Sequence, residues 1–337
     1  MHIIALGPRG FVRTGAARNA FPACEVAMGI PPLRRSGAAA LALTLACAAC
    51  RREAPKPPAL PPSQPVDIRV TGVGLRSPES VLYDSAADTY LVSNINGSAF
   101  AKDDNGFISR LTPDGHVASL KWIAGGARGV VLNGPKGMGL KGDTLFVADI
   151  DAVRLFNRKS GAPIASVAIP RATFLNDIAV GPDGTVYITD TGIQPLGNGS
   201  ARSGADALWK LGPAHRPVAI ARGQDLGGPN GIIAESAGVT MVTLGSGQVF
   251  HFDAAGVRTE LPRPPQGGLD GIVRLPDGSL LVTSWEGNAI YRLSAAGQYT
   301  LAVPGATSPA DIGWDPTRHR LLIPLLTLDQ IEIRELR

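Results

Sequence analysis

The residues of this chain with the clearest chemical potential recur directly before short apolar runs. Each follows a Pro or a Leu and stands at the start of a strand-like stretch. Together we call these residues the axial ring. In chain order the six axial-ring residues are Glu79, Lys136, Asn176, Asn230, Asp270 and Ala310. Carboxylate and amide oxygens are hard ligands, so two carboxylates and two amides brought together suit one divalent cation, Ca²⁺ first, with Mg²⁺, Mn²⁺ or Zn²⁺ as alternatives.

Without a cation, the carboxylates of Glu79 and Asp270 would repel each other in a partly dry site. One of them would then take up a proton or pair with Lys136. The other interpretation is that Asn-Gly and Asp-Gly are ordinary turn dipeptides before strands, which would make each residue a turn former. Four oxygen-bearing side chains in six equivalent places favour the metal interpretation.

The spacing of these six segments predicts the architecture that would bring them together. They begin at residues 78, 135, 175, 229, 269 and 309, so three of the five intervals are 40 residues long. A period near 40 with four short strands is typical of a β-propeller blade, which cannot bury its own face and stacks on its neighbours. We therefore predict an all-β, six-bladed β-propeller with four-stranded antiparallel blades, in which the axial ring faces a common centre.

The last repeat has sequence for only three strands. We expect residues 66–73 to add the missing outer strand, so that the N-terminal strand closes the ring and leaves no open blade edge. The two longest repeats carry extra residues at 97–107 and 192–206. Both insertions should overhang the face where the axial-ring side chains emerge, as a pocket rim; freely varying surface loops are the alternative.

The first 65 residues do not fit the repeat. Residues 1–49 have the layout of a signal peptide, with Met28 as an alternative start. Cys50 would then be the lipidated first residue of the mature chain, and the proline-rich residues 50–65 a tether to the propeller at 66–337. The C-x-x-C spelled by Cys47 and Cys50 could also be a redox or metal motif, but its apolar leader favours processing.

This leader predicts a lipoprotein of the bacterial cell envelope that faces the periplasm. The chain would attach to the membrane through a lipid on Cys50, and Arg51 and Arg52 after it favour the outer membrane over the inner one. The leader also explains the formal charge of +4, because five arginines and one glutamate in residues 1–49 give 5 − 1 = +4 and leave the remainder neutral. No basic patch for nucleic acid survives its removal.

Four short motifs resemble one enzyme family. They are Ser77-Pro78-Glu79-Ser80-Val81, Leu175-Asn176-Asp177, Pro229-Asn230-Gly231 and Leu269-Asp270-Gly271. They resemble the senescence marker protein, gluconolactonase and luciferin-regenerating enzyme family, and are similar more distantly to paraoxonases and diisopropylfluorophosphatase. The resemblance implies a six-bladed propeller with an axial divalent cation that hydrolyses lactones or phosphoesters. It also implies that Glu79, Asn176, Asn230 and Asp270 are the metal ligands, with Asp270 also the catalytic base or nucleophile.

One departure from the family concerns the substrate. Members that act on sugar lactones often carry Arg two residues before the first of these asparagines, where this chain has Phe174. An apolar or smaller lactone or ester is therefore the expected substrate, bound with the help of Phe174 and, for an anionic group, Lys136. The predicted function is a divalent-metal-dependent lactone or ester hydrolase. The alternative is a non-catalytic, lipid-anchored propeller that binds a ligand or a protein, since the fold alone does not imply catalysis.

Overall fold

The computed structural model describes residues 68–197 and 199–336. The predicted signal peptide, the lipidated Cys50 and the proline-rich tether lie outside the described residues, so they stay predictions. By its internal contacts the chain divides into residues 1–57 and 58–337, and all the described residues belong to the second unit. Among the described residues, no helix is long and apolar enough to cross a membrane.

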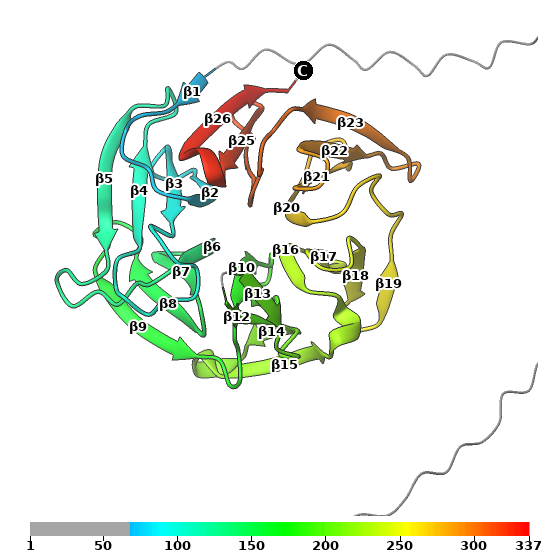
Figure 1. Ribbon diagram of the computed structural model, residues 1–337, viewed down its shortest axis with the longest axis horizontal. Coiled ribbons are helices and arrows are strands. Elements are labelled where there is room, and N and C mark those ends of the chain that lie inside the picture. The colour runs from blue at the N-terminus through cyan, green and yellow to red at the C-terminus, as the bar shows by residue number, and fades with distance from the viewer. Residues whose placement is uncertain (1–67, 198, 337) are drawn as a thin grey trace, which may run out of the picture. The chain divides into compact units, whose positions relative to one another are not determined.

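The described residues form a six-bladed β-propeller, which confirms the predicted fold (Figure 1). Each blade is a four-stranded antiparallel sheet whose first strand lies at the axis and whose fourth lies at the rim. Blades 1 to 3 consist of β2 (Pro78–Asp84), β3 (Thr89–Asn94), β4 (Phe107–Leu111), β5 (Val117–Ala124); β6 (Pro135–Lys141), β7 (Thr144–Asp149), β8 (Ala152–Asn157), β9 (Pro163–Ala168); and β10 (Leu175–Val180), β11 (Val186–Asp190), β14 (Ala207–Leu211), β15 (Pro217–Arg222).

The second half of the ring repeats the same order. Blades 4 and 5 consist of β16 (Pro229–Glu235), β17 (Gly238–Thr243), β18 (Val249–Asp253), β19 (Arg258–Glu260); and β20 (Leu269–Arg274), β21 (Leu280–Ser284), β22 (Ala289–Leu293), β23 (Tyr299–Pro304). The helical segments among the described residues are three single-turn 3₁₀ helices, η1 (Pro213–His215), η2 (Gln224–Leu226) and η3 (Leu326–Leu328).

The sixth blade joins the two ends of the described chain. Its inner strands are β24 (Gly313–Asp315), β25 (Arg320–Leu325) and β26 (Gln330–Glu335), and its outer strand is β1 (Ile68–Val70). Strand β1 pairs antiparallel with β26, with Ile68 opposite Ile333. The predicted closure by the N-terminal strand is therefore confirmed, and among the described residues of the expected 66–73 segment, Ile68–Val70 pair with β26.

Apolar side chains fill the spaces between neighbouring blades. The cluster between blades 2 and 3, for example, contains Phe146 of β7, Ile178 of β10 and Trp209 of β14, each at most 3% exposed. Successive residues of a strand face opposite sides of its sheet, so each blade buries one face against each neighbour. The core is thus divided among the blade interfaces, and removing one blade would expose two of them.

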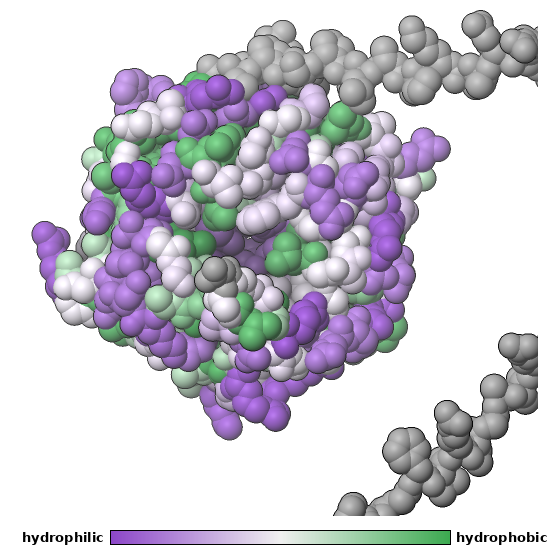
Figure 2. Space-filling model, in the orientation of Figure 1, coloured by the Kyte–Doolittle hydropathy of each residue, from purple (hydrophilic) through white to green (hydrophobic). Residues whose placement is uncertain are grey.

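The insertion at residues 192–206 contains a hairpin that the sequence analysis did not predict. Strands β12 (Ile193–Leu196) and β13 (Gly199–Arg202) pair only with each other. The hairpin leaves blade 3 between β11 and β14 and lies on the viewer's side of that blade in Figure 1. We call this side, where the inner strands begin, the near face. Seen from it, the surface is hollowed at the centre of the ring (Figure 2).

Candidate active site on the propeller axis

The same irregularity at the start of five inner strands positions the axial ring. In blade 1, Pro78 pairs with Asn94, but regular pairing resumes only at Val81. The same register shift occurs in β6, β10, β16 and β20. The axial-ring residue and the one after it therefore leave the ladder, as in a β-bulge, and their side chains are re-aimed. This repeated bulge is what a sequence pattern of strands and turns could not show.

The axial ring is buried. Its five polar members are each at most 5% exposed, and Ala310 is fully buried. Burial raises the pKa of Glu79 well above its ordinary value, and the charge of Asp270 raises it further, while that of Lys136 lowers it. Glu79, Asp270 and Lys136 thus share one electrostatic environment, as the sequence predicted. Ala310 has no polar side-chain atom, so blade 6 supplies no side-chain ligand at this position.

Hydrogen bonds fix which atom of Asn176 remains free. Its Nδ2 donates to Thr191 Oγ1 over 2.9 Å, and Thr191 Oγ1 donates its own proton to Pro229 O over 2.8 Å. Because the hydroxyl proton is committed to a carbonyl, the Thr191 oxygen can only accept from Asn176. The amide nitrogen must therefore face Thr191, which leaves Asn176 Oδ1 as the available ligand atom.

Asn230 and Asp270 are oriented by the same logic. Asn230 Nδ2 donates to the backbone carbonyl of Leu269 over 3.1 Å, so its Oδ1 is the atom left over. The indole Nε1 of Trp285 donates to Asp270 Oδ2 over 2.8 Å. The other oxygen, Asp270 Oδ1, is buried and has no hydrogen-bond partner of normal geometry among the described residues, although the Asn230 side chain is close enough to the carboxyl to lower its pKa.

The carboxylates carry the largest electrostatic cost in the site. Glu79 Oε2, like Asp270 Oδ1, is buried without a partner. Burial raises the pKa of Asp270 to about 8, and the neighbouring Asp311 adds to the rise. Unpaired buried acceptors are rare in proteins, and ionising them without a counter-charge is unfavourable. These two oxygens therefore require protons or a cation.

Lys136 does not supply that counter-charge by direct contact. Its Nζ donates to Gly134 O over 2.9 Å and lies 4.1 Å from the centre of the Phe174 ring. It forms no ion pair with Glu79. Burial lowers the pKa of Lys136, and nearby carboxylates oppose the shift. The ammonium thus lies between Gly134 O and the Phe174 ring and interacts with Glu79 through its charge, without forming an ion pair.

Phe174 joins the axial ring to the first insertion. It is 8% exposed, and its ring lies 4.9 Å from that of Phe100, which belongs to the insertion at 97–107. The same insertion is tied to blade 2 by Lys102, whose Nζ is 2.5 Å from Asp151 Oδ2. The two predicted substrate-binding residues, Lys136 and Phe174, are therefore in contact with each other at one apolar side of the site.

Two acidic residues at the ends of second strands proved to be loop anchors. Asp149 accepts the backbone N–H groups of residues 133 and 134, and Asp190 those of residues 173 and 174. These are the loops that lead directly into the axial ring. The sequence shows both residues as the last polar position of a strand, but their partners become visible only in three dimensions.

The described residues contain no group of three or more His, Cys, Asp and Glu placed to hold a metal ion. The axial ring contributes only two carboxylates, and its other oxygen donors are the amides of Asn176 and Asn230. This donor set fits a hard cation such as Ca²⁺, Mg²⁺ or Mn²⁺ and fits Zn²⁺ less well, because Zn²⁺ sites are dominated by nitrogen and sulfur ligands. The two orphaned carboxylate oxygens are the observation that favours a cation.

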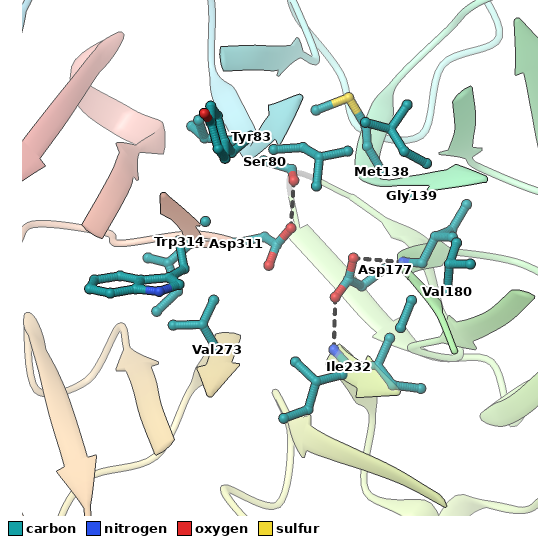
Figure 3. Close-up of a pocket in the computed structure, with 18 of the residues that line it drawn as sticks. Ser80, Tyr83, Met138, Gly139, Asp177, Val180, Ile232, Val273, Asp311 and Trp314 are labelled. Carbon is teal, nitrogen blue, oxygen red and sulfur yellow. Dashed lines mark hydrogen bonds between the residues drawn. The ribbon is translucent and has the colours of Figure 1, made fainter. Parts of the chain in front are cut away.

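A cavity of about 480 Å³ continues the axis on the far side of the ring. It is lined by all six inner strands and begins at the residues that follow the axial ring (Figure 3). There Ser80 Oγ donates to Asp311 Oδ2 over 2.5 Å, and Asp177 accepts the backbone N–H groups of Ile178 and Ile232. Burial raises the pKa of Asp311 to about 7. Both carboxylates thus support neighbouring strands, and their charges act on the ring above.

The fold and the polar axis define a six-bladed propeller with a buried, oxygen-rich central site. The chain belongs to the SMP-30/gluconolactonase/LRE-like family, whose model matches residues 78–323. The predicted resemblance is therefore confirmed. No curated protein matches the chain in sequence.

Solved structures share the fold at low sequence identity. A gluconolactonase from Xanthomonas campestris is 16% identical, with 82% of this chain and 98% of that chain covered and a TM-score of 0.58. Another protein assigned to the gluconolactonases is 15% identical, with 81% and 93% covered and a TM-score of 0.59. Virginiamycin B lyase from Staphylococcus aureus is 14% identical, with 77% and 95% covered and a TM-score of 0.54.

Proposed function

We propose that this protein is a divalent-cation-dependent hydrolase of a lactone or ester, with Ca²⁺ as the preferred ion. The observation that carries the proposal is the pair of buried, unpartnered oxygens Glu79 Oε2 and Asp270 Oδ1. Beside them, Asn176 and Asn230 have their amide nitrogens engaged and their oxygens left over. Membership of a family that includes gluconolactonase supports a lactonase-type activity.

Glu79, Asn176, Asn230 and Asp270 would hold the cation. When bound there, it would polarise the substrate carbonyl and stabilise the charge that develops on its oxygen. Asp270 would act as the base that takes a proton from the attacking water, or as the nucleophile itself. Since Oδ2 of Asp270 accepts the indole N–H of Trp285, Oδ1 is the oxygen left to face the cation, and its remaining lone pair is the one available for this step. Burial of the ring excludes bulk water from the developing charge.

The wall of the site favours an apolar or small substrate. Phe174 and Phe100 present aromatic surface where a sugar-binding arginine would stand in relatives, so hydroxyl-rich lactones would lose hydrogen bonds there. Lys136 holds its ammonium over Phe174 and has donors left after its bond to Gly134 O. It would bind an anionic substituent of the substrate.

The predicted leader supports a proposal about where in the cell the protein acts. With Cys50 lipidated and residues 50–65 as a spacer, the propeller would face the periplasm from the outer membrane and meet small molecules there. A non-catalytic binding role for the same anchored propeller is the second candidate. It is favoured by the interruption of the axial ring at Lys136 and Ala310, since a buried lysine beside the cation site opposes cation binding.

Asp270→Asn tests the proposal, because it removes the base while keeping the shape of the side chain. The matched control is Asp277→Asn, in an exposed turn of the same blade. We expect turnover of a panel of alkyl, aromatic and sugar lactones to fall at least 1,000-fold in the first variant, about 4 kcal/mol of transition-state stabilisation. Turnover should stay near the wild-type level in the second. Turnover that survives in Asp270→Asn would refute the assignment, and no turnover in the wild-type chain would favour the binding role.

A further inference from the structure

One residue in each blade stands beside the axial ring, directly after the second strand. In five of the six blades its backbone N–H donates to the carbonyl of the residue two before the ring position, over 2.8 to 3.2 Å. These positions are therefore structurally equivalent, and we call them the outer ring. In blade order the outer-ring residues are Ile95, Ile150, Thr191, Leu244, Trp285 and Leu326.

Blade 2 departs from this rule in an informative way. Ile150 has a positive φ of 55° and does not donate to Gly134 O, and Lys136 Nζ occupies that carbonyl instead. The exception accounts for the direction of Lys136, because the blade offers its ammonium a backbone acceptor that the other blades have already used.

Four outer-ring residues are aliphatic, and only Thr191 and Trp285 have a polar side-chain atom. Each of these two hydrogen-bonds to the ring residue of its own blade. Thr191 Oγ1 accepts from Asn176 Nδ2, and Trp285 Nε1 donates to Asp270 Oδ2. In both cases the hydrogen bond can run in only one direction. The Thr191 hydroxyl already donates its proton to Pro229 O and can only accept from the amide, and the Trp285 indole can only donate to the carboxylate.

Two of the aliphatic outer-ring residues stand beside ring residues that need no further orientation. Asn230, beside Leu244, is already oriented by the backbone carbonyl of Leu269. Ala310, beside Leu326, has no side-chain atom to orient. Glu79, beside Ile95, is the exception, because its Oε2 is buried without a partner. The two polar outer-ring residues therefore orient Asn176 and Asp270 only.

We propose that Thr191 and Trp285 are positioning residues of the axial site, which fix Oδ1 of Asn176 and Oδ1 of Asp270 as the oxygens offered to the cation. This inference rests on the proposed function. Groups that hydrogen-bond metal ligands orient those ligands, and their loss typically weakens metal affinity 10- to 100-fold. Neither residue would touch the cation or the substrate.

The test is isothermal titration of the metal-free full chain with Ca²⁺. Thr191→Val removes the hydroxyl at nearly constant volume, and Thr191→Ser restores it. Trp285→Phe removes the indole N–H, and Trp314→Phe is its control, because Trp314 lines the far cavity and its Nε1 bonds to nothing in the described structure. Thermal unfolding without Ca²⁺ shows that each variant is folded.

We expect Thr191→Val and Trp285→Phe each to raise the Kd for Ca²⁺ at least tenfold, with Thr191→Ser and Trp314→Phe within about threefold of wild type. Wild-type affinity in both Thr191→Val and Trp285→Phe would overturn the positioning role while leaving the cation site in place. Absence of Ca²⁺ binding in the wild-type chain would overturn the proposed function and this inference together.

Discussion

Binding of Ca²⁺ to the axial ring should release protons, because burial favours the protonated form of its two carboxyl groups when the cation is absent. Burial and Asp311 raise the pKa of Asp270 to about 8. Burial likewise raises the pKa of Glu79 well above its ordinary value. A cation binds the ionised forms, so any proton held by either carboxyl group must leave on binding.

The expected release at pH 7 is therefore greater than zero, and it should decline above pH 8 as Asp270 ionises without help. Over the same range, affinity should rise up to tenfold per pH unit for each proton released. Calorimetric titration in buffers of different ionisation enthalpy measures the proton count directly. Asp270→Asn should lower this count. A release near zero in the wild-type chain would show that these carboxylates are not the ligands.

Three further predictions concern stability and specificity. Metal-free protein should lose stability as the pH rises from about 4 to 8, because Asp270 and Asp311 have a raised pKa in the folded state and stabilise the fold only while they are protonated. Each such group lowers the free energy of unfolding by up to about 1.4 kcal/mol per pH unit. Thermal scans should show that Ca²⁺ restores more stability at pH 8 than at pH 5. Lys136→Met should raise KM about tenfold or more for lactones that bear a carboxylate, with neutral lactones within about twofold; equal losses on both would exclude a role in substrate selection. Gly231→Ala should lower the free energy of unfolding, measured by urea denaturation, by about 1–3 kcal/mol, since its Cβ would lie 2.2 Å from Asp270 O. Gly199→Ala is the control and should be close to neutral, because its Cβ would meet only an atom 3.9 Å away.

The repeat explains why so much of the fold was predictable. The turn and strand patterns of the fourth repeat predict strands near 231–234, 239–243, 248–253 and 258–261, and the structure has β16 to β19 at nearly the same residues. A period of 40 with turn chemistry between short apolar runs leaves few alternatives to a propeller, because each strand pattern is local. The hairpin β12–β13 escaped prediction, since its strands are exposed and follow no apolar alternation.

The site was predictable only as far as it is repeated. The six axial-ring positions were found because they recur at the start of each inner strand. The hydrogen bonds that orient them were not, because Thr191 and Trp285 lie 15 residues along the chain from Asn176 and Asp270 and carry no motif. From the sequence alone, Lys136 could also pair with Glu79. In the structure, its ammonium donates instead to the backbone carbonyl of Gly134 in blade 2.

The central claim is that a cation on the axis is required for turnover. The most direct measurement treats the purified chain with a chelator, determines its bound metal, and follows lactone hydrolysis before and after stoichiometric Ca²⁺ is returned. We predict one tightly held divalent ion per chain, loss of hydrolysis with the ion, and recovery when Ca²⁺ is restored. Hydrolysis that continues in metal-free protein would contradict the account.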